Sequence, residues 1–142
     1  MPIVAAVDES ERAGPIVEEA ARLGAAMELP VHVIHVLTRE GFVELEQTSV
    51  TRSNGPVPME DVIEGATAVA RRAAEEAHAD ATAVGLMGDP AEEVVTYADE
   101  HEAEYLVIAG RKRSPVGKAL FGSVVQSMLL DAPCPVVSVR LD

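Results

Sequence analysis

Short apolar runs alternate with longer segments of helical periodicity along the whole chain. The apolar runs are too short for helices and predict buried strands at 3–7, 31–37, 81–86, 105–109 and 136–139. The periodic segments predict helices at 15–27, 59–79, 90–101 and 123–130. This alternation predicts an α/β fold, a doubly wound, Rossmann-like three-layer sandwich with five parallel strands and helices on both faces.

Local signals predict where several elements begin and end. Ser10 is a candidate N-cap for the first helix, and Pro30 ends that helix. Gly88, Asp89 and Pro90 predict a turn, an N-cap and the first position of a helix. The segment 38–58 is rich in Gly and Pro without a sustained period, which predicts a long, mobile crossover. The last helix is expected to turn four apolar residues inward: Val124, Val125, Met128 and Leu129.

Length and composition predict one domain over residues 1–142 with an aliphatic core. Hydrophobic residues make up 48% of the 142 residues, enough for a real core, but aromatics are only 3%. The single cysteine, Cys134, excludes an internal disulfide framework. It leads into an apolar run with no evident base nearby, which favours a small buried hydrophobe over a catalytic thiol.

The charge balance is strongly acidic and excludes some partner classes. The net charge of −13 predicts a surface that repels nucleic acid and anionic membranes. Many carboxylates with only two lysines favour a halophilic, archaeal source, with an ordinary acidic cytosolic protein as the alternative. No apolar stretch reaches the ~18 residues of a membrane span, and the start of the chain lacks a basic signal region. The expected location is the cytoplasm.

A ligand site is expected where the strand order of an open parallel sheet reverses. If the first strand is central, the carboxyl ends at that point carry Asp8, Val36 and Gly110, which should converge in space. The Asp8 carboxylate can accept hydrogen bonds from a ribose or an adenine amino group. Alternatively, it serves only to cap the first helix.

The segment 110–123 carries the strongest functional signal, because it is a basic island in an acidic chain. Four of the chain's 11 basic residues fall in it: Arg111, Lys112, Arg113 and Lys118. It leaves a strand with Gly110 and opens a helix at Ser123, where backbone N–H groups and the hydroxyl favour an anion. We therefore predict anion binding. The alternative is a solvated loop with a glycine turn and a serine cap.

Other nucleotide and catalytic signatures are missing from the sequence. Neither Gly-x-Gly-x-x-Gly after the first strand nor Gly-x-x-x-x-Gly-Lys-Ser/Thr occurs, and no Asp follows the third strand as in receiver domains. His32 and His35 have an odd spacing that places them on opposite faces of a strand, which disfavours metal binding. No Ser/His/Asp or Cys/His arrangement can be argued from spacing.

Several motifs resemble the universal stress protein family. They are IVAAVDESE (3–11), VHVIHV (31–36), GDPAEE (88–93), YLVIAG (105–110), FGSV (121–124) and APCPVVSV (132–139). The resemblance covers nearly the whole chain and implies the spatial strand order 3-2-1-4-5. It also implies a homodimer that pairs the last strands through Val136, Val137 and Val139, an edge that would need a partner.

One branch of that family binds ATP and is marked by Gly-x2-Gly-x9-Gly-Ser/Thr. Gly110 and the pair Gly122-Ser123 match its ends, whereas Arg113 replaces the second glycine and the loop is one residue shorter. Arg113 would either block the approach of the backbone or contact a phosphate as a cation. The remaining residues that the resemblance implies are Ala6, Val7 and Asp8 for ribose and adenine, Val36 and Ala109 for the base, and Gly110, Gly122, Ser123 and Val124 for the phosphates.

The first functional hypothesis is a homodimeric stress-response regulatory protein that binds ATP or AMP, with or without a divalent cation. No residue is evidently placed to activate a water, so any ATPase activity should be slow. The alternative is a nucleotide-free interaction module that regulates a transporter, a kinase or another protein. A third reading is an enzyme of the related adenine-nucleotide hydrolase group.

Overall fold

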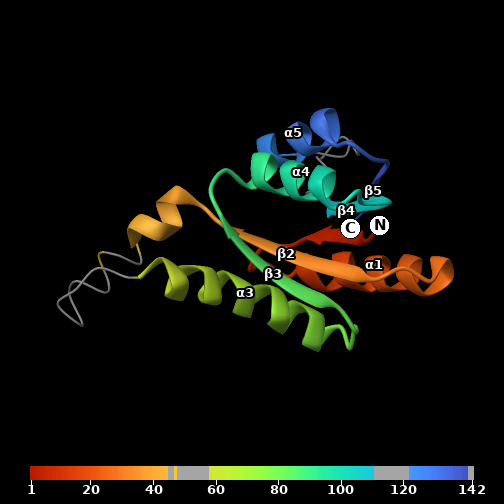
Figure 1. Cartoon of the computed structure of the whole chain (residues 1–142), viewed down its shortest axis with the longest axis horizontal. Coiled ribbons are helices and arrows are strands. Elements are labelled where there is room, and N and C mark those ends of the chain that lie inside the picture. Colours follow the sequence, from red (N-terminus) through yellow and green to blue (C-terminus); the bar gives the residue numbers. More distant parts are fainter. Residues whose placement is uncertain (45–46, 48–57, 111–121, 141–142) are drawn as a thin grey trace, which may run out of the picture.

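The computed structural model describes residues 1–44, 47, 58–110 and 122–140. Its strands are β1 (Ile3–Ala6), β2 (Val31–Leu37), β3 (Thr82–Met87), β4 (Tyr105–Ala109) and β5 (Val136–Val139). Its numbered helices are α1 (Ala13–Met27), α3 (Met59–Glu76), α4 (Pro90–Glu100) and α5 (Ser123–Asp131). Helices lie on both sides of one twisted sheet (Figure 1).

The five strands are all parallel and follow the order β3-β2-β1-β4-β5, which confirms the expected doubly wound fold. Strand β1 is central, with Ile3 opposite Val31 of β2 and opposite Tyr105 of β4. Ile3, Val4 and Ala5 have no exposed surface, because strands covered on both faces are apolar throughout. The central strand therefore holds the two halves of the sheet together.

The two faces of the sheet have separate cores. On the α1/α3 face, Ile3, Ala5 and Val33 pack against apolar residues of both helices. On the α4/α5 face, Val4, Ile34 and Leu106 pack against α4 and α5. The alternation of side chains along each strand sends neighbours such as Ile3 and Val4 to opposite cores.

The start of α4 follows the sequence prediction. Gly88 adopts a positive φ of 144°, where a side chain would be strained, and Asp89 is the N-cap. The Oδ2 atom of Asp89 accepts a hydrogen bond from Glu92 N at 2.9 Å. Pro90 stands in the first turn, where its missing N–H costs nothing.

Other predictions of local structure were wrong. The helix α1 begins at Ala13 with Arg12, not Ser10, as the N-cap residue. The Ser10 hydroxyl donates to Asp8 and accepts hydrogen bonds from the backbone N–H and the Nε of Arg12, all in the turn before the helix. Residues 39–44 are helical rather than irregular, because Thr38 Oγ1 accepts a hydrogen bond from Gly41 N at 3.0 Å and starts a turn. The rest of that crossover, 45–46 and 48–57, lies outside the described residues.

The last helix differs most from its predicted pattern. Its N-cap is Gly122, not Ser123, and Met128 is its only buried residue. Val125 is half-buried, whereas Val124 and Leu129 are 38% and 39% exposed. The reason is that α5 covers the sheet only partly and leaves a hollow beneath its first turn.

Among the residues that the structure describes, no helix is long and apolar enough to cross a membrane.

Candidate functional site

A cavity of about 340 Å³ lies where β1, β2 and β4 end and where α1, α4 and α5 begin. Its position at the carboxyl ends of the strands, between β1 and its two neighbours, is where open parallel sheets bind ligands. Its size falls within the usual range for small-molecule sites. The carboxyl end of the sheet therefore offers a pre-formed pocket.

Eight of the ten residues expected at the site line this cavity. They are Ala6, Val7, Asp8, Val36, Ala109, Gly122, Ser123 and Val124. Gly110 is not among the lining residues, and its N–H donates to Val139 O at 3.3 Å. Arg113 lies outside the described residues. The fold thus brings together segments that are more than a hundred residues apart in sequence.

The cavity is lined by apolar residues and by a few polar ones. The apolar wall includes Ile34, Val36, Val94, Ile108 and Met128, all buried. The polar side chains that line it are Asp8, Arg12, His35, Thr38 and Ser123. An apolar slot with a few convergent polar groups suits a planar organic ring that carries polar substituents.

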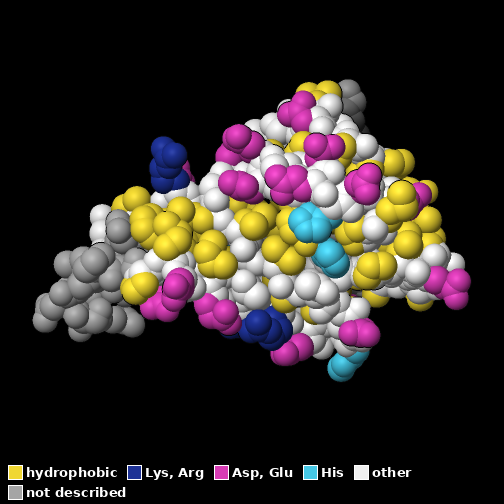
Figure 2. Space-filling model, viewed as in Figure 1, with side chains coloured by type: hydrophobic (Ala, Val, Ile, Leu, Met, Phe, Trp, Pro, Cys, Tyr) yellow, Lys and Arg dark blue, Asp and Glu magenta, His cyan; other side chains and the backbone are white. Residues whose placement is uncertain are grey.

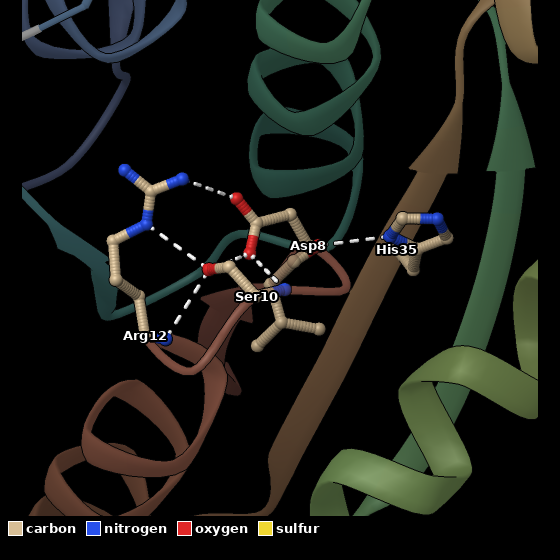
Figure 3. Close-up of polar contacts among 5 residues, drawn as sticks. Asp8, Ser10, Arg12 and His35 are labelled. Atoms are coloured by element: carbon tan, nitrogen blue, oxygen red, sulfur yellow. Dashed lines mark hydrogen bonds and ion pairs between the residues drawn. The ribbon is translucent and has the colours of Figure 1, made fainter.

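Asp8 lies at the centre of a hydrogen-bonded loop between β1 and α1 (Figure 3). Its Oδ1 atom accepts hydrogen bonds from Ser10 N at 2.9 Å and from Ser10 Oγ. Its Oδ2 atom accepts one from Arg12 Nη2 at 2.8 Å, which is also an ion pair. Arg12 in turn donates to Ser10 Oγ from Nε at 3.1 Å. Asp8, Ser10 and Arg12, called the Asp8 network below, hold one another in place.

The electrostatics of the network keep Asp8 ionised. Burial raises the pKa of Asp8, but the hydrogen bonds from Ser10 and the charge of Arg12 outweigh it, so the pKa lies below its ordinary value. The carboxylate is therefore a hydrogen-bond acceptor for a ligand hydroxyl or amino group at any physiological pH.

His35, in β2, holds the backbone at the end of β1 in place by a hydrogen bond. It is buried, and its Nδ1 donates to Val7 O at 3.0 Å, while Val7 N donates to Ile34 O at 2.9 Å. These two bonds fix the backbone immediately before Asp8. His32 lies on the opposite face, where its Nδ1 lies 2.6 Å from the hydroxyl of Tyr97 in α4, which confirms the predicted placement of the two histidines.

Three helices begin at the cavity, and their first turns differ in charge. The start of α4 is capped by Asp89 and carries Glu92 and Glu93. The starts of α1 and α5 have no side-chain cap and no acidic residue in the first turn. Free N–H groups and the helix dipole attract anions. The charge distribution therefore places the anion-attracting side of the cavity at α5 and the anion-repelling side at α4, whereas the start of α1 carries the ion pair of Asp8 and Arg12.

Sequence reasoning missed several of the lining residues. Arg12, Thr38, Val94 and Met128 all line the cavity but were not expected there. The position of Arg12, four residues after Asp8 at a helix start, was a usable signal, because that spacing allows an ion pair. The apolar residues gave no signal, since their periodicity only marks them as core.

Two further features were checked for site chemistry. Cys134 is half-buried rather than fully buried as the sequence predicted, and burial together with nearby Glu104 raises the pKa of its thiol, which makes it a weaker nucleophile. Within the described part of the chain, no group of three or more His, Cys, Asp or Glu side chains could hold a metal ion.

Comparison with known proteins places the chain in a family. The model of the universal stress protein family matches residues 1–140. A universal stress protein of Mycolicibacterium smegmatis is 52% identical over 52 residues, which are 37% of this chain and 40% of that protein. The chain thus matches about two fifths of that relative's length.

Two solved structures are similar over nearly the full length. The universal stress protein of Archaeoglobus fulgidus is 31% identical with a TM-score of 0.62, and 97% of each chain is covered. A structure of the universal stress protein from the same organism in complex with dAMP is 27% identical with a TM-score of 0.58, covering 97% of this chain and 96% of that one. On the family match and the shared fold, this chain belongs to the universal stress protein family.

Proposed function

We propose that this protein is a stress-response regulatory protein that binds an adenine nucleotide, AMP or ATP, in the cavity at the carboxyl ends of the strands. The observation that carries the proposal is the make-up of the cavity. An apolar wall, an ionised carboxylate and an acid-free helix start converge in a space of about 340 Å³. A base, a ribose and a phosphate require these three environments.

The charges around the cavity support one orientation of the nucleotide. The phosphate would lie at the start of α5, where Gly122, Ser123 and Val124 have backbone N–H groups without a side-chain cap. Asp8 would accept hydrogen bonds from the ribose or the amino group, and Val36 and Ala109 would pack on the base. The acidic start of α4 would repel a phosphate placed there. The complex of the related Archaeoglobus protein with dAMP supports the same ligand class.

Substitution of Val124 tests the phosphate site with little risk to the fold. Val124 lines the cavity, is 38% exposed and lies in the first turn of α5. We expect Val124→Glu to weaken AMP binding at least tenfold, because a carboxylate there repels the phosphate. Val124→Gln, which is nearly the same size and neutral, is the matched control and should bind within about threefold of the wild type.

Calorimetry with AMP, ATP and adenosine, with and without Mg²⁺, measures these affinities. Absence of heat and of a thermal shift at millimolar nucleotide would remove the proposal. Equal losses in the Glu and Gln variants would contradict the phosphate position while leaving the cavity as the site.

We propose binding without fast turnover. Asp8 is already engaged by Ser10 and Arg12, and His35 donates to Val7 O, so neither is free to activate a water in this conformation. Any hydrolysis of ATP should be slow compared with the dissociation of the nucleotide. Single-turnover phosphate release measures this.

The nucleotide-free interaction module is the second candidate, and the outer side of α5 favours it. Leu130 is 85% exposed and Leu129 is 39% exposed, an apolar surface that a partner would cover. If the wild-type protein bound neither AMP nor ATP in calorimetry, that result would support this alternative.

A homodimer through β5 is a further proposal. β5 is an edge strand in the described sheet, and its residues Val136, Val137 and Val139 are only half-buried. An unpaired, valine-rich edge favours pairing with a second copy. Light scattering should give twice the chain mass at micromolar concentration, and a monomer would contradict the dimer.

The halophilic, archaeal source and the cytoplasmic location stay predictions. On the face shown in Figure 2, Asp and Glu side chains outnumber Lys and Arg side chains, in line with the net charge of −13. Such a surface should gain stability as salt screens its self-repulsion. A melting temperature that does not rise between 0.1 M and 2 M KCl would contradict the halophilic prediction.

A further inference from the structure

Arg12 is the one Lys or Arg side chain among the described residues that line the cavity. It comes from the residue just before α1, and its side chain is 34% exposed. Its backbone N–H and its Nε donate to Ser10 Oγ, and its Nη2 donates to Asp8 Oδ2. The side chain is therefore held at the mouth of the cavity and does not extend freely into solvent.

The guanidinium still has donors to offer. It carries five N–H groups, and the contacts to Asp8 and Ser10 use two of them. In Figure 3, one terminal nitrogen of Arg12 has no dashed line, and the structure gives Nη1 no partner among the described residues. An anion that enters the cavity can accept hydrogen bonds from these donors without breaking the ion pair with Asp8.

The surroundings of Arg12 favour an anion over a neutral ligand. The first turn of α1 has no side-chain cap and no acidic residue, so its dipole adds to the positive charge of Arg12. Arg12 is paired with Asp8, and the exposed Glu9 and Glu11 beside it in sequence are not cavity residues, so Arg12 is the one cation among the described residues that line the cavity. A charge-assisted hydrogen bond is about twice as strong as a neutral one.

Arg12 also limits what a neutral ligand can gain from Asp8. The Oδ2 atom is occupied by Arg12, and the Oδ1 atom accepts two hydrogen bonds from Ser10. A ribose hydroxyl or an amino group must share these oxygens with protein donors. A nucleoside alone therefore gains little from the carboxylate, whereas a phosphate gains a cation.

We infer that Arg12 is a specificity-determining residue that makes the cavity select phosphorylated nucleosides over unphosphorylated ones. This inference rests on the proposed nucleotide binding and adds a residue that neither the glycine motif nor the start of α5 supplies. The same guanidinium holds Asp8 and faces the anion, so one side chain couples ligand charge to the position of the carboxylate.

The test compares Arg12→Gln with the wild type in calorimetric binding of AMP and adenosine. We expect AMP to bind about tenfold more weakly, because one charge-assisted contact is lost. Adenosine should bind equally well or slightly more tightly, because Asp8 Oδ2 becomes free. The ratio of the two affinities is the decisive quantity.

Arg22→Gln is the matched control. Arg22 lies in α1, the helix that Arg12 precedes, and forms an ion pair of the same length, 2.8 Å, with Glu19, but it is not a cavity residue. Its loss should leave both affinities within error of the wild type. Arg12→Lys keeps a charge without the fork of donors and should fall between the wild type and the Gln variant.

The outcomes separate the two levels of the inference. If the wild type binds neither AMP nor ATP, the proposed function fails and the role of Arg12 fails with it. If the wild type binds AMP but Arg12→Gln keeps the wild-type ratio of AMP to adenosine affinity, only the role of Arg12 is overturned. The ¹³C titration of Asp8 adds a ligand-free readout: its pKa should rise in Arg12→Gln, and an unchanged pKa would contradict the pairing.

Discussion

The two faces of the sheet are covered in different ways. On the α1/α3 face, each helix buries five residues, of which two are alanine in α1 and four are alanine in α3. On the α4/α5 face, α4 buries three residues and α5 only Met128. The cavity opens beneath the helices of this second face and borders α1 only at its start.

This difference separates stability from binding. Small residues at the contacts of α1 and α3 let the helices approach the sheet closely. On the α4/α5 face, the start of α5 packs less closely on the sheet, and the cavity beneath it is lined by the first residues of α5 and by apolar side chains. The cavity therefore lies at the carboxyl ends of the strands under α4 and α5, and we expect the packing of α1 and α3 to supply more of the stability.

The largest effect is expected from filling the tightest contact of the α1/α3 face. A Cβ on Gly85 would lie 2.5 Å from Ile63 O and closer still to Thr67 N, both in the backbone of α3. Backbone atoms cannot move aside cheaply, so Gly85→Ala should destabilise the protein by about 3 kcal/mol. Urea denaturation followed by circular dichroism measures this loss.

Gly65→Ala is the control, in α3, the helix that Gly85 of β3 contacts. A Cβ at Gly65 has nothing within 4 Å, and the residue is exposed. This change should stabilise the protein by about 0.5–1 kcal/mol, because alanine favours a helix more than glycine does. Equal effects of the two substitutions would contradict the close contact between α3 and β3.

A smaller effect is expected from the looser face. Met128 is 5% exposed and is the only buried residue of α5, and it also lines the cavity. Met128→Ala should cost about 2 kcal/mol, at the low end for such changes, because its side chain borders an existing hollow. The same denaturation assay checks it, and nucleotide affinity should fall as the wall recedes. If Met128→Ala destabilised the protein more than Gly85→Ala, the α4/α5 face would contribute more to stability than the α1/α3 face, against the proposed contrast.

Much of the fold was predictable because parallel sheets impose strict geometry. The order of strands and helices followed from alternating runs, and Asp8 and Val36 were expected to converge because parallel strands end at one edge. The start of α4 was predictable for the same kind of reason, since Gly88, Asp89 and Pro90 each have a narrow backbone role. Backbone rules of this type transfer directly from sequence to structure.

Features that depend on competition between side chains were not predictable. Ser10 looked like a helix cap, but its hydroxyl bonds to Asp8 and Arg12 in the turn before α1, and the helix begins at Ala13. The periodicity of α5 predicted four inward residues, but the helix covers the sheet only partly and buries Met128 alone. A periodic pattern gives the inward direction of a helix and not how much sheet lies beneath it.

The smallest effect on stability is expected from the side-chain contacts that hold the end of α4 against the sheet. The end of α4 opposite the cavity is held by the contact of 2.6 Å between His32 Nδ1 and the hydroxyl of Tyr97, with His101 stacked on Tyr97. Burial lowers the pKa of His32, and the positive charges of His101 and of the amino terminus lower it further. Because the folded protein resists protonation of His32, its contribution to stability is complete above pH 6.5 and is lost as the pH falls through the lowered pKa.

His32→Gln should therefore reduce the loss of stability between pH 7.5 and pH 5.5, as measured by urea denaturation at both values. His78→Gln is the control, because His78 is exposed beyond the end of α3. It should keep the wild-type pH dependence. If the free energy of unfolding depended on pH in the same way in the wild type and in His32→Gln, the contact between His32 and Tyr97 would not stabilise the position of α4. In that case the packing of Val94 and Ala98, both buried, would hold α4 by itself.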